Sequence, residues 1–333
     1  MGGCTLTGAL AVTTSVTDGI SIVHGPAGCA HHNFSLFFST ALGNDEVRIP
    51  AIASSCLSGE DVIFGGEDAL EIALDRARSK DPGTIFVLTS CVAATIGDDV
   101  AGICAERTGI PVVLVPTEGF LGGDFRKGFS NALIALSDGC RQSDRTGGVN
   151  IIGEKNLDSM AEIHYREVRR LLAALGLSVN IRFVRNIRSG DIPRLGCGCL
   201  NILRDTGLSD VGEHFEHRLG IPALGGFPAG LSGTIRFLES AGECCDLDWA
   251  GAVLREESFQ REMIEEFMSL SGHHVRLVME PGSDGFSHAS ELAGAVGLIF
   301  DDEGSPLPVP SPFPVGTTGC RRLLHRWRCA VRD

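Results

Sequence analysis

The sequence predicts an α/β fold of Rossmann-like units with mostly parallel sheets. Short apolar runs rich in β-branched residues recur along the 333 residues, and segments with helical periodicity lie between them. Strands that alternate with helices pair in parallel, because each crossover helix returns the chain to the same end of the sheet. The composition, 43% hydrophobic and 21% charged, is typical of a globular protein and not of a disordered one.

Seven apolar runs are expected to be strands. They begin at Ile20, Thr84, Pro111, Val149, Val179, Leu200 and Val275. Helical spacing is clear in residues 67–80 and 159–176, where apolar side chains recur on one stripe. The two stripes are formed by Leu70, Ala73, Leu74 and Ala77, and by Ile163, Val168, Leu171 and Leu172.

Polar, glycine-containing residues 137–148 separate a first unit from a second. We expect Rossmann-like domains at 1–145 and 146–242, followed by a shortened third unit with a closing segment at 243–333. This last part contains one helical segment, one strand and the proline-rich stretch 305–314, which we expect to be an ordered surface connection.

Charge and hydropathy exclude several classes of partner. The formal net charge of −14 repels phosphate backbones, so we expect no nucleic-acid partner. No apolar run approaches the roughly 18–20 residues that cross a bilayer, and the first residues lack the basic region of a secretory signal. We therefore expect a cytoplasmic protein without a membrane partner, whose 12 cysteines stay reduced as buried thiols or metal ligands.

Several common catalytic motifs are missing from the sequence. It contains no G-x-x-x-x-G-K-[ST] loop and no G-x-G-x-x-G placed after a strand. It also lacks a G-x-S-x-G elbow and an H-E-x-x-H zinc helix. We expect that the chain alone neither hydrolyses ATP nor binds a dinucleotide by these routes.

Two cysteines follow predicted strands directly, in turns where ligands of α/β sheets bind. Cys29 ends the glycine-rich turn GPAGC, and Cys91 begins a helix-like stretch that leads to Asp98 and Asp99, for which we expect a helix N-terminus. Cys4 lies in a glycine-rich arm. If these loops meet at one sheet edge, three thiolates suit an iron–sulfur site. The residues alone leave open the alternative that all three are buried structural thiols.

Four other side chains are weaker site candidates. Cys56 falls between Cys29 and Cys91 and is a candidate spare ligand, and Glu118 ends another predicted strand, where it is a candidate for lining a cavity. His31 and His32 follow Cys29 and face either a substrate cavity or solvent.

The cysteine segments carry a family resemblance. HGPAGC at 24–29 resembles the HGPxGC motif of the nitrogenase component 1 family, and SCVAATIGDD at 90–99 resembles its cysteine-containing IGDD motif. Cys4 is similar to the first cysteine of the family. Similar segments follow at 60–70, 150–154, 200–230 and 310–324, so the resemblance covers nearly the whole chain.

This resemblance implies that Cys4, Cys29 and Cys91 hold an iron–sulfur cluster, 4Fe–4S or larger, near a subunit interface. A second copy in a homodimer, or a paralogous partner subunit, would complete the site. Electrons would come from an ATP-hydrolysing iron-protein reductase. The function expected first is reduction of an unidentified substrate by a nitrogenase-like oxidoreductase. The alternatives are a non-catalytic scaffold for assembly of a nitrogenase-type cofactor, or a tetrapyrrole reductase.

The sequence departs from true nitrogenases at their large metal cofactor. Their cofactor cysteine follows the asparagine of an LN-x-x-x-C stretch, and after Asn201 the matching place here is Asp205. No late histidine matches the second ligand, and the third domain is shortened. Dinitrogen reduction is therefore not expected of this chain.

Overall fold

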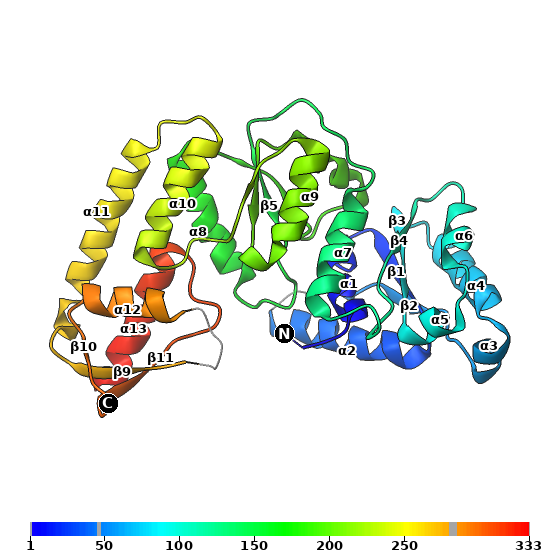
Figure 1. Ribbon diagram of the computed structural model, residues 1–333, viewed down its shortest axis with the longest axis horizontal. Helices are drawn as coiled ribbons and strands as arrows, with labels where there is room; N and C mark the ends of the chain where they lie inside the picture. The colour runs from blue at the N-terminus through cyan, green and yellow to red at the C-terminus, as the bar shows by residue number, and fades with distance from the viewer. Residues whose placement is uncertain (1, 45–47, 280–284, 333) are drawn as a thin grey trace. The chain divides into compact units, whose positions relative to one another are not determined.

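The computed structural model describes residues 2–44, 48–279 and 285–332, and these form two compact units (Figure 1). The first unit contains residues 1–161 and 179–225, and the second contains residues 162–178 and 226–333. Each is described separately below.

The first sheet of the first unit has four parallel strands in the order β2-β1-β3-β4. They are β1 (Gly19–His24), β2 (Ile52–Ser54), β3 (Thr84–Thr89) and β4 (Val112–Val115). Strands β1 and β3 pair in register along their whole length, from Gly19 opposite Thr84 to His24 opposite Thr89. All their carboxyl ends consequently lie at one edge of the sheet.

Helices cover both faces of this sheet, which is why its central strands are apolar on both sides. Ile85 and Val87 of β3 pack toward α4 (Glu67–Arg78) and α6 (Val100–Ala105). Phe86 and Leu88 belong to the core shared with α1 (Thr5–Thr13) and α7 (Phe125–Ser137). Figure 1 shows these two helix pairs on opposite sides of the strands. Three further helices border the sheet: α2 (Ala27–Gly43), α3 (Gly59–Phe64) and α5 (Cys91–Ile96).

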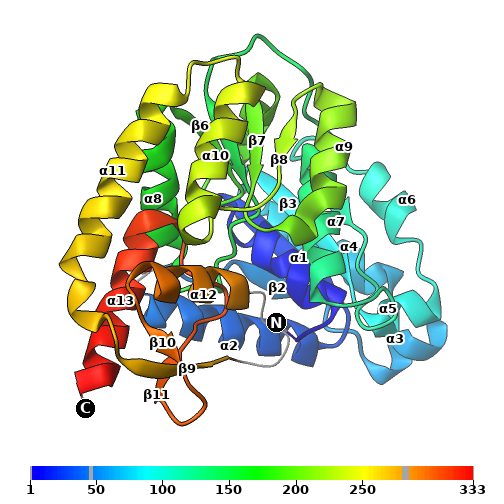
Figure 2. The same ribbon diagram turned by 60° about the vertical axis from the view of Figure 1, so that its left-hand side comes forward.

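The second sheet of the same unit is also parallel, in the order β6-β5-β7-β8. Its strands are β5 (Val149–Ile152), β6 (Val179–Phe183), β7 (Leu200–Leu203) and β8 (Ala223–Leu224), three of them labelled in Figure 2. The 3₁₀ helices η1 (Ser189–Cys197) and η2 (Thr206–Leu208) and helix α9 (Ser209–Leu219) connect these strands. One apolar core extends from α1 and α7 to Ile152 and Phe183 of this sheet.

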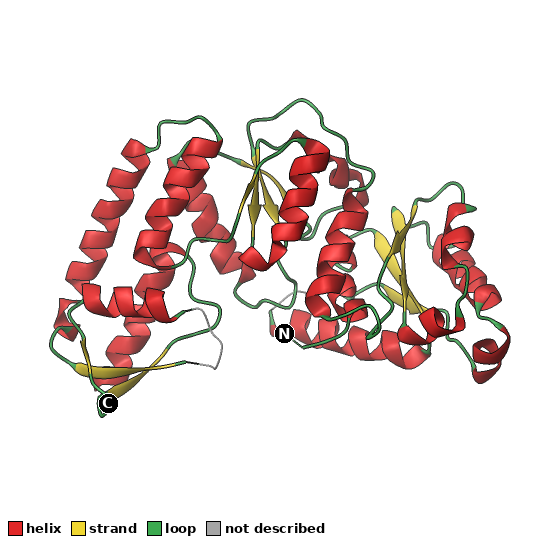
Figure 3. Ribbon diagram, in the orientation of Figure 1, coloured by secondary structure: helices red, strands yellow, loops and turns green. Residues whose placement is uncertain are grey.

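The second unit is mainly helical and carries a small three-stranded sheet, order β10-β9-β11, seen in yellow in Figure 3. Its strands are β9 (His274–Val278), β10 (Ile299–Phe300) and β11 (Ser305–Pro308), and its helices are α8 (Ala161–Ala174), α10 (Gly230–Cys244), α11 (Ala250–Glu266), η3 (Met268–Leu270), α12 (Phe286–Ala295) and α13 (Gly316–Arg332). The proline-rich stretch begins as β11 at the sheet edge, where a proline without an N–H is tolerated.

A charged cluster joins three helices of the second unit. Arg170 of α8 donates to Glu167 at 2.9 Å and to Glu256 of α11 at 2.8 Å. Thr317 of α13 donates its hydroxyl to Glu256 at 2.5 Å. Both carboxylates are buried, and buried charges of this kind are stable because each is paired and hydrogen-bonded. We assign this cluster a structural role.

Helices α1 and α7 cross with their backbones in contact. A Cβ added to Gly8 would lie 1.9 Å from the Phe125 carbonyl oxygen, and one added to Gly128 would lie 1.9 Å from the Thr5 carbonyl oxygen. Every residue of α1 is buried, so this helix is a central element of the unit. The crossing also fixes the position of Cys4, the residue that precedes α1.

The expected α/β class with parallel sheets is confirmed, and each of the seven expected runs contains a strand. The short strands β2, β8 and β10 were not predicted, because two or three residues are too few for a periodicity signal. Strand β11 was not predicted because it lies in the proline-rich stretch that was expected to be a surface connection. The domain boundaries expected after residues 145 and 242 stay predictions. Among the described residues, no helix has the length and apolarity needed to cross a membrane.

The glycine crossing predicts a large loss of stability for Gly8→Ala. The added methyl group meets backbone atoms of α7, which cannot rotate away, so the free energy of unfolding should fall by about 2 kcal/mol or more. In Gly139→Ala the methyl group meets nothing within 4 Å, and a change within about 0.5 kcal/mol is expected. Chemical denaturation of both variants measures the difference, and equal midpoints would contradict the crossing.

Candidate cluster site

Site candidates follow each of the four strands at the carboxyl edge of the first sheet. Cys56 follows β2, Cys29 follows β1, Cys91 follows β3 and Glu118 follows β4. Since the strands are neighbours in the order β2-β1-β3-β4, their following loops gather at this edge. The edge is therefore where the sequence candidates must be compared.

Gly119 brings Cys4 and Cys91 to the same place. The residue after Cys4, Thr5, donates its N–H and its hydroxyl to the Gly119 carbonyl oxygen, at 3.3 and 2.6 Å. A Cβ on Gly119 would lie 2.6 Å from the Cys91 backbone nitrogen. Gly119 also has a φ of +55°, which favours glycine. No side chain fits between these two cysteine-bearing segments.

The loops of Cys29 and Cys91 are in contact through Gly25 and Ser90. Ser90 donates its N–H to the His24 carbonyl oxygen at 2.9 Å, and a Cβ on Gly25 would lie 2.3 Å from the Ser90 hydroxyl oxygen. The same hydroxyl accepts the N–H of Ala93 at 3.3 Å and so caps α5, the helix that begins with Cys91.

The thiols of Cys4 and Cys91 are close enough to Cys29 to influence its ionisation. Burial raises the pKa of Cys29, and the nearby thiols of Cys91 and Cys4 raise it further. All three cysteines are partly buried and free of disulfide bonds. Three soft sulfur donors that lie this close, beside glycine backbone, suit an iron–sulfur cluster held by thiolates. Within the described residues, no group of three or more His, Cys, Asp or Glu side chains is arranged to hold a single metal ion.

The weaker candidates lie around this site without joining it. Cys56 is exposed, has a φ of +57° and directs its thiol to the Ser54 carbonyl oxygen at 3.7 Å. Glu118 is exposed and also has a φ of +57°. His31 and His32 are exposed on α2, so the interpretation as solvent-facing side chains fits better than one of lining a cavity.

Sequence reasoning missed a buried pair, His24 and Asp98. His24 Nε2 lies 2.9 Å from a carboxylate oxygen of Asp98, and the two side chains are 0% and 3% exposed. Asp99 caps α6, accepting the Gly102 N–H at 2.9 Å, whereas Asp98 accepts the N–H of Gly66, the residue that precedes α4, also at 2.9 Å. The available signal was the polar His24 at the end of an otherwise apolar strand, which needs a buried partner.

Beside this pair lies an exposed apolar segment, α3. Its Ile63 and Phe64 are 75% and 81% exposed, although large apolar side chains are rarely left in water without a function. A hollow of about 490 Å³ is lined by this segment together with Glu67, Asp68 and Asp98. Phe120 and Leu121, in the loop after Glu118, are 76% and 65% exposed. Exposed apolar side chains therefore lie on α3 and in the loop that follows Gly119, whose backbone packs against Cys91.

The place of the missing cofactor cysteine is filled by protein groups. The Asp205 carboxylate accepts hydrogen bonds from the Lys155 ammonium at 3.0 Å and from the Gly207 N–H at 3.1 Å, and the second of these caps η2. The Lys155 ammonium in turn lies 5.6 Å from the centre of the buried Phe129 ring. These residues offer no thiolate at the position where true nitrogenases hold their large cofactor.

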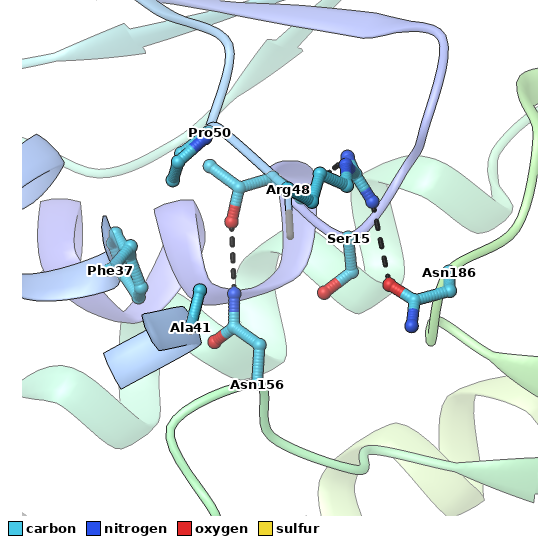
Figure 4. A pocket seen from close by; sticks show the side chains of 8 residues that line it. Ser15, Phe37, Ala41, Arg48, Pro50, Asn156 and Asn186 are labelled. Atoms are coloured by element: carbon cyan, nitrogen blue, oxygen red, sulfur yellow. Dashed lines mark hydrogen bonds between the residues drawn. The ribbon is translucent and has the colours of Figure 1, made fainter. Parts of the chain in front are cut away.

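A second, much smaller cavity lies elsewhere in the first unit (Figure 4). Arg48 donates to the Thr14 carbonyl oxygen at 2.5 Å and to the Asn186 side-chain oxygen at 3.4 Å. Asn156 donates to the Thr14 hydroxyl at 3.0 Å. The volume of about 30 Å³ is that of a water molecule, so this cavity holds no cluster.

Comparison with known proteins identifies relatives across most of the chain. The family model described as nitrogenase component 1 type oxidoreductase matches residues 4–294. Over 228 residues the chain is 31% identical to the nitrogenase iron-molybdenum cofactor biosynthesis protein NifE of Clostridium pasteurianum, covering 66% of this chain and 49% of that protein. It is 30% identical over 235 residues to the protein of the same name from Nostoc sp., covering 67% and 47%.

Among solved structures, one titled "Nitrogenase Cp1 at pH 5" aligns with a TM-score of 0.69 and 21% identity, covering 90% of this chain and 63% of that chain. This likeness confirms the fold. The chain spans about half the length of the curated relatives it matches.

Thiol reactivity tests the assignment of the remaining cysteines. Burial raises the pKa of Cys104 and of Cys140 to about 11, and that of Cys320 to about 12. At pH 8 on the order of one thiol in a thousand is ionised at a pKa of about 11, and one in ten thousand at about 12, and only the thiolate reacts with iodoacetamide. Mass spectrometry of the native chain should find these three unlabelled while the exposed Cys56 and Cys329 are labelled. Equal labelling would contradict the burial.

Proposed function

Because this chain belongs to the nitrogenase component 1 type oxidoreductase family, we propose that it carries an iron–sulfur cluster, 4Fe–4S or larger, on Cys4, Cys29 and Cys91. We further propose that it acts as a scaffold subunit on which a nitrogenase-type metal cofactor is assembled.

One observation carries the cluster proposal: the segments of Cys4, Cys29 and Cys91, distant in sequence, meet through backbone contacts at Gly119 and Gly25 that leave no room for side chains. The pKa of Cys29, raised by burial and by the thiols of Cys91 and Cys4, agrees with this convergence. Isolated structural thiols have no need of such convergence. A cluster would bind the three thiolates and supply sites for storing and passing electrons.

Two observations favour the scaffold over the reduction of a substrate. The relatives with the highest similarity reported above are named as cofactor biosynthesis proteins. Asp205, held by Lys155, stands where true nitrogenases have a cofactor cysteine. Substrate reduction remains the second candidate function, favoured by the oxidoreductase description of the family.

The exposed apolar segments support two protein partners. Phe120 and Leu121 border the cysteines, and a second copy or a paralogous subunit that covered them would shield the cluster and complete its ligands. The exposed side of α3 carries Ile63 and Phe64 beside Glu60 and Asp61. This combination suits a partner with an apolar centre and basic rim, and we propose the ATP-hydrolysing iron protein.

We propose that the chain works in the cytoplasm, a reducing compartment in which Cys4, Cys29 and Cys91 would stay reduced for a cluster.

Removal of one ligand should remove the cluster. In anaerobically purified Cys29→Ala, iron and sulfide per chain should fall to a small fraction of the wild-type content, because a cluster with two remaining protein thiolates is weakly held. Cys329→Ala, at an exposed position, is the matched control and should keep its iron. Cys56→Ala tests the spare ligand and should also keep iron. A Cys29→Ala protein with full iron content would refute the assignment.

Transfer of a cluster separates the two candidate functions. A scaffold loaded with iron, sulfide and molybdate should activate an apo-nitrogenase added to it, and should lose its own metal in proportion. A reductase should instead keep its metal and consume electrons from an added iron protein and ATP. Metal analysis after the two proteins are separated again measures the transfer. Retained metal combined with substrate turnover would reject the scaffold in favour of reduction.

A further inference from the structure

A continuous hydrogen-bonded chain leads from the end of α3 to the turn before Cys29. The Gly66 N–H donates to one carboxylate oxygen of Asp98 at 2.9 Å, and the other oxygen lies 2.9 Å from His24 Nε2. The second ring nitrogen, Nδ1, lies 3.0 Å from the Ser55 hydroxyl, which accepts the Gly25 N–H at 3.0 Å. Gly25 opens the GPAGC turn that ends in Cys29.

Ser55 is able to take either role toward His24. Its hydroxyl oxygen accepts the Gly25 N–H and keeps a second lone pair, so it can donate its proton to His24 Nδ1 or accept one from it. A ring that carries its proton on Nε2 donates it to Asp98 and accepts the Ser55 proton on Nδ1. Every group from Gly66 to Gly25 is thereby satisfied in a buried setting, where the loss of one bond is costly.

Packing leaves this chain little freedom to absorb movement. A Cβ on Gly66 would lie 2.3 Å from the side chain of Leu57, 2.9 Å from an Asp98 carboxylate oxygen and 3.4 Å from the His24 ring. Leu57 donates its N–H to the Gly25 carbonyl oxygen at 3.1 Å. Gly66 is therefore packed against both connections to Gly25, the direct one through Leu57 and the hydrogen-bonded one through Asp98, His24 and Ser55. Directly before it lie Phe64 and Gly65, the exposed end of α3.

We propose that His24 and Asp98 are positioning residues that couple the exposed side of α3 to the turn carrying Cys29. Displacement of α3 moves Gly66, Gly66 moves Asp98, and His24 transmits the change to Gly25. A protein bound at α3 would by this route alter the surroundings of the cysteine ligands, a consequence that rests on the proposed function. Neither residue touches the thiols directly.

The test measures Cys29 in the full-length chain without iron. Alkylation rates of Cys29 are followed by peptide mass spectrometry, and amide hydrogen exchange is followed in residues 24–30, with residues 149–152 as internal reference. Asp98→Ala and Gly66→Ala should each raise the Cys29 rate at least about threefold, as for coupled residues in contact. The matched controls are Asp99→Ala, which loses a neighbouring helix cap, and Gly59→Ala, whose methyl group meets nothing within 4 Å.

Two further variants separate coupling from general destabilisation. In Asp98→Asn the amide oxygen accepts the Gly66 N–H, and the amide N–H donates to His24 Nε2. The ring then carries its proton on Nδ1 and donates it to the Ser55 hydroxyl oxygen, so the alkylation rate of Cys29 should stay close to that of the wild type. In the double variant Gly66→Ala with Asp98→Ala the two effects should not multiply, because both break one chain. If Asp98→Ala does not fold, Ser55→Ala replaces it.

The proposal is overturned if Gly66→Ala behaves like Gly59→Ala, if the two effects multiply, or if residues 149–152 lose protection equally. Because the measurement uses thiols and amides, its outcome is independent of the cluster. A wild type that binds no iron would reject the proposed function while the coupling is still measured. A wild type that binds iron, with variants whose Cys29 alkylation rate is unchanged, would reject the coupling and leave the proposed function standing.

Discussion

The site depends on one constraint, the parallel pairing of β1 and β3 in register along all six residues. It places His24 opposite Thr89, so that both strands end at the same level and each passes into a helix-bearing turn. As a result, Cys29 and Cys91 lie in neighbouring turns at the same edge of the sheet. A shift of one residue would invert the faces of the strand and move the apolar side chains out of the two cores. The same pairing that buries β3 therefore also fixes the spacing of two thiols.

Much of this was predictable from the sequence, for identifiable reasons. The runs that form β3 and β5 are strongly apolar, and the helix at 67–80 repeats its apolar stripe without interruption. The cysteines after β1 and β3 could be assigned to one edge, because parallel strands end together. What could not be predicted depends on contacts distant in the chain: the Gly8 crossing that sets Cys4, and the pairing of His24 with Asp98.

The fold accommodates Asp205 through local contacts alone. The strand before it, β7, and its pairing with β5 are regular, so the backbone there needs no cofactor to be stable. The carboxylate is used locally, for a helix cap and for the Lys155 ion pair. The architecture of the family is therefore retained without the thiolate that holds the large cofactor, and function has to be argued from the site rather than from the fold.

The three thiols form an arrangement that is unfavourable for the ionised protein alone. Burial opposes ionisation of Cys29, and negative charge on Cys91 or Cys4 opposes it further, which is why its pKa is raised. A positively charged iron–sulfur core would reverse both effects, because it would neutralise the thiolates and replace the water they have lost. Tight backbone contacts at Gly119 and Gly25 hold the three cysteine-bearing segments together without such a core. On the proposed function, the fold would thus present the thiols in advance at the place where the cluster binds.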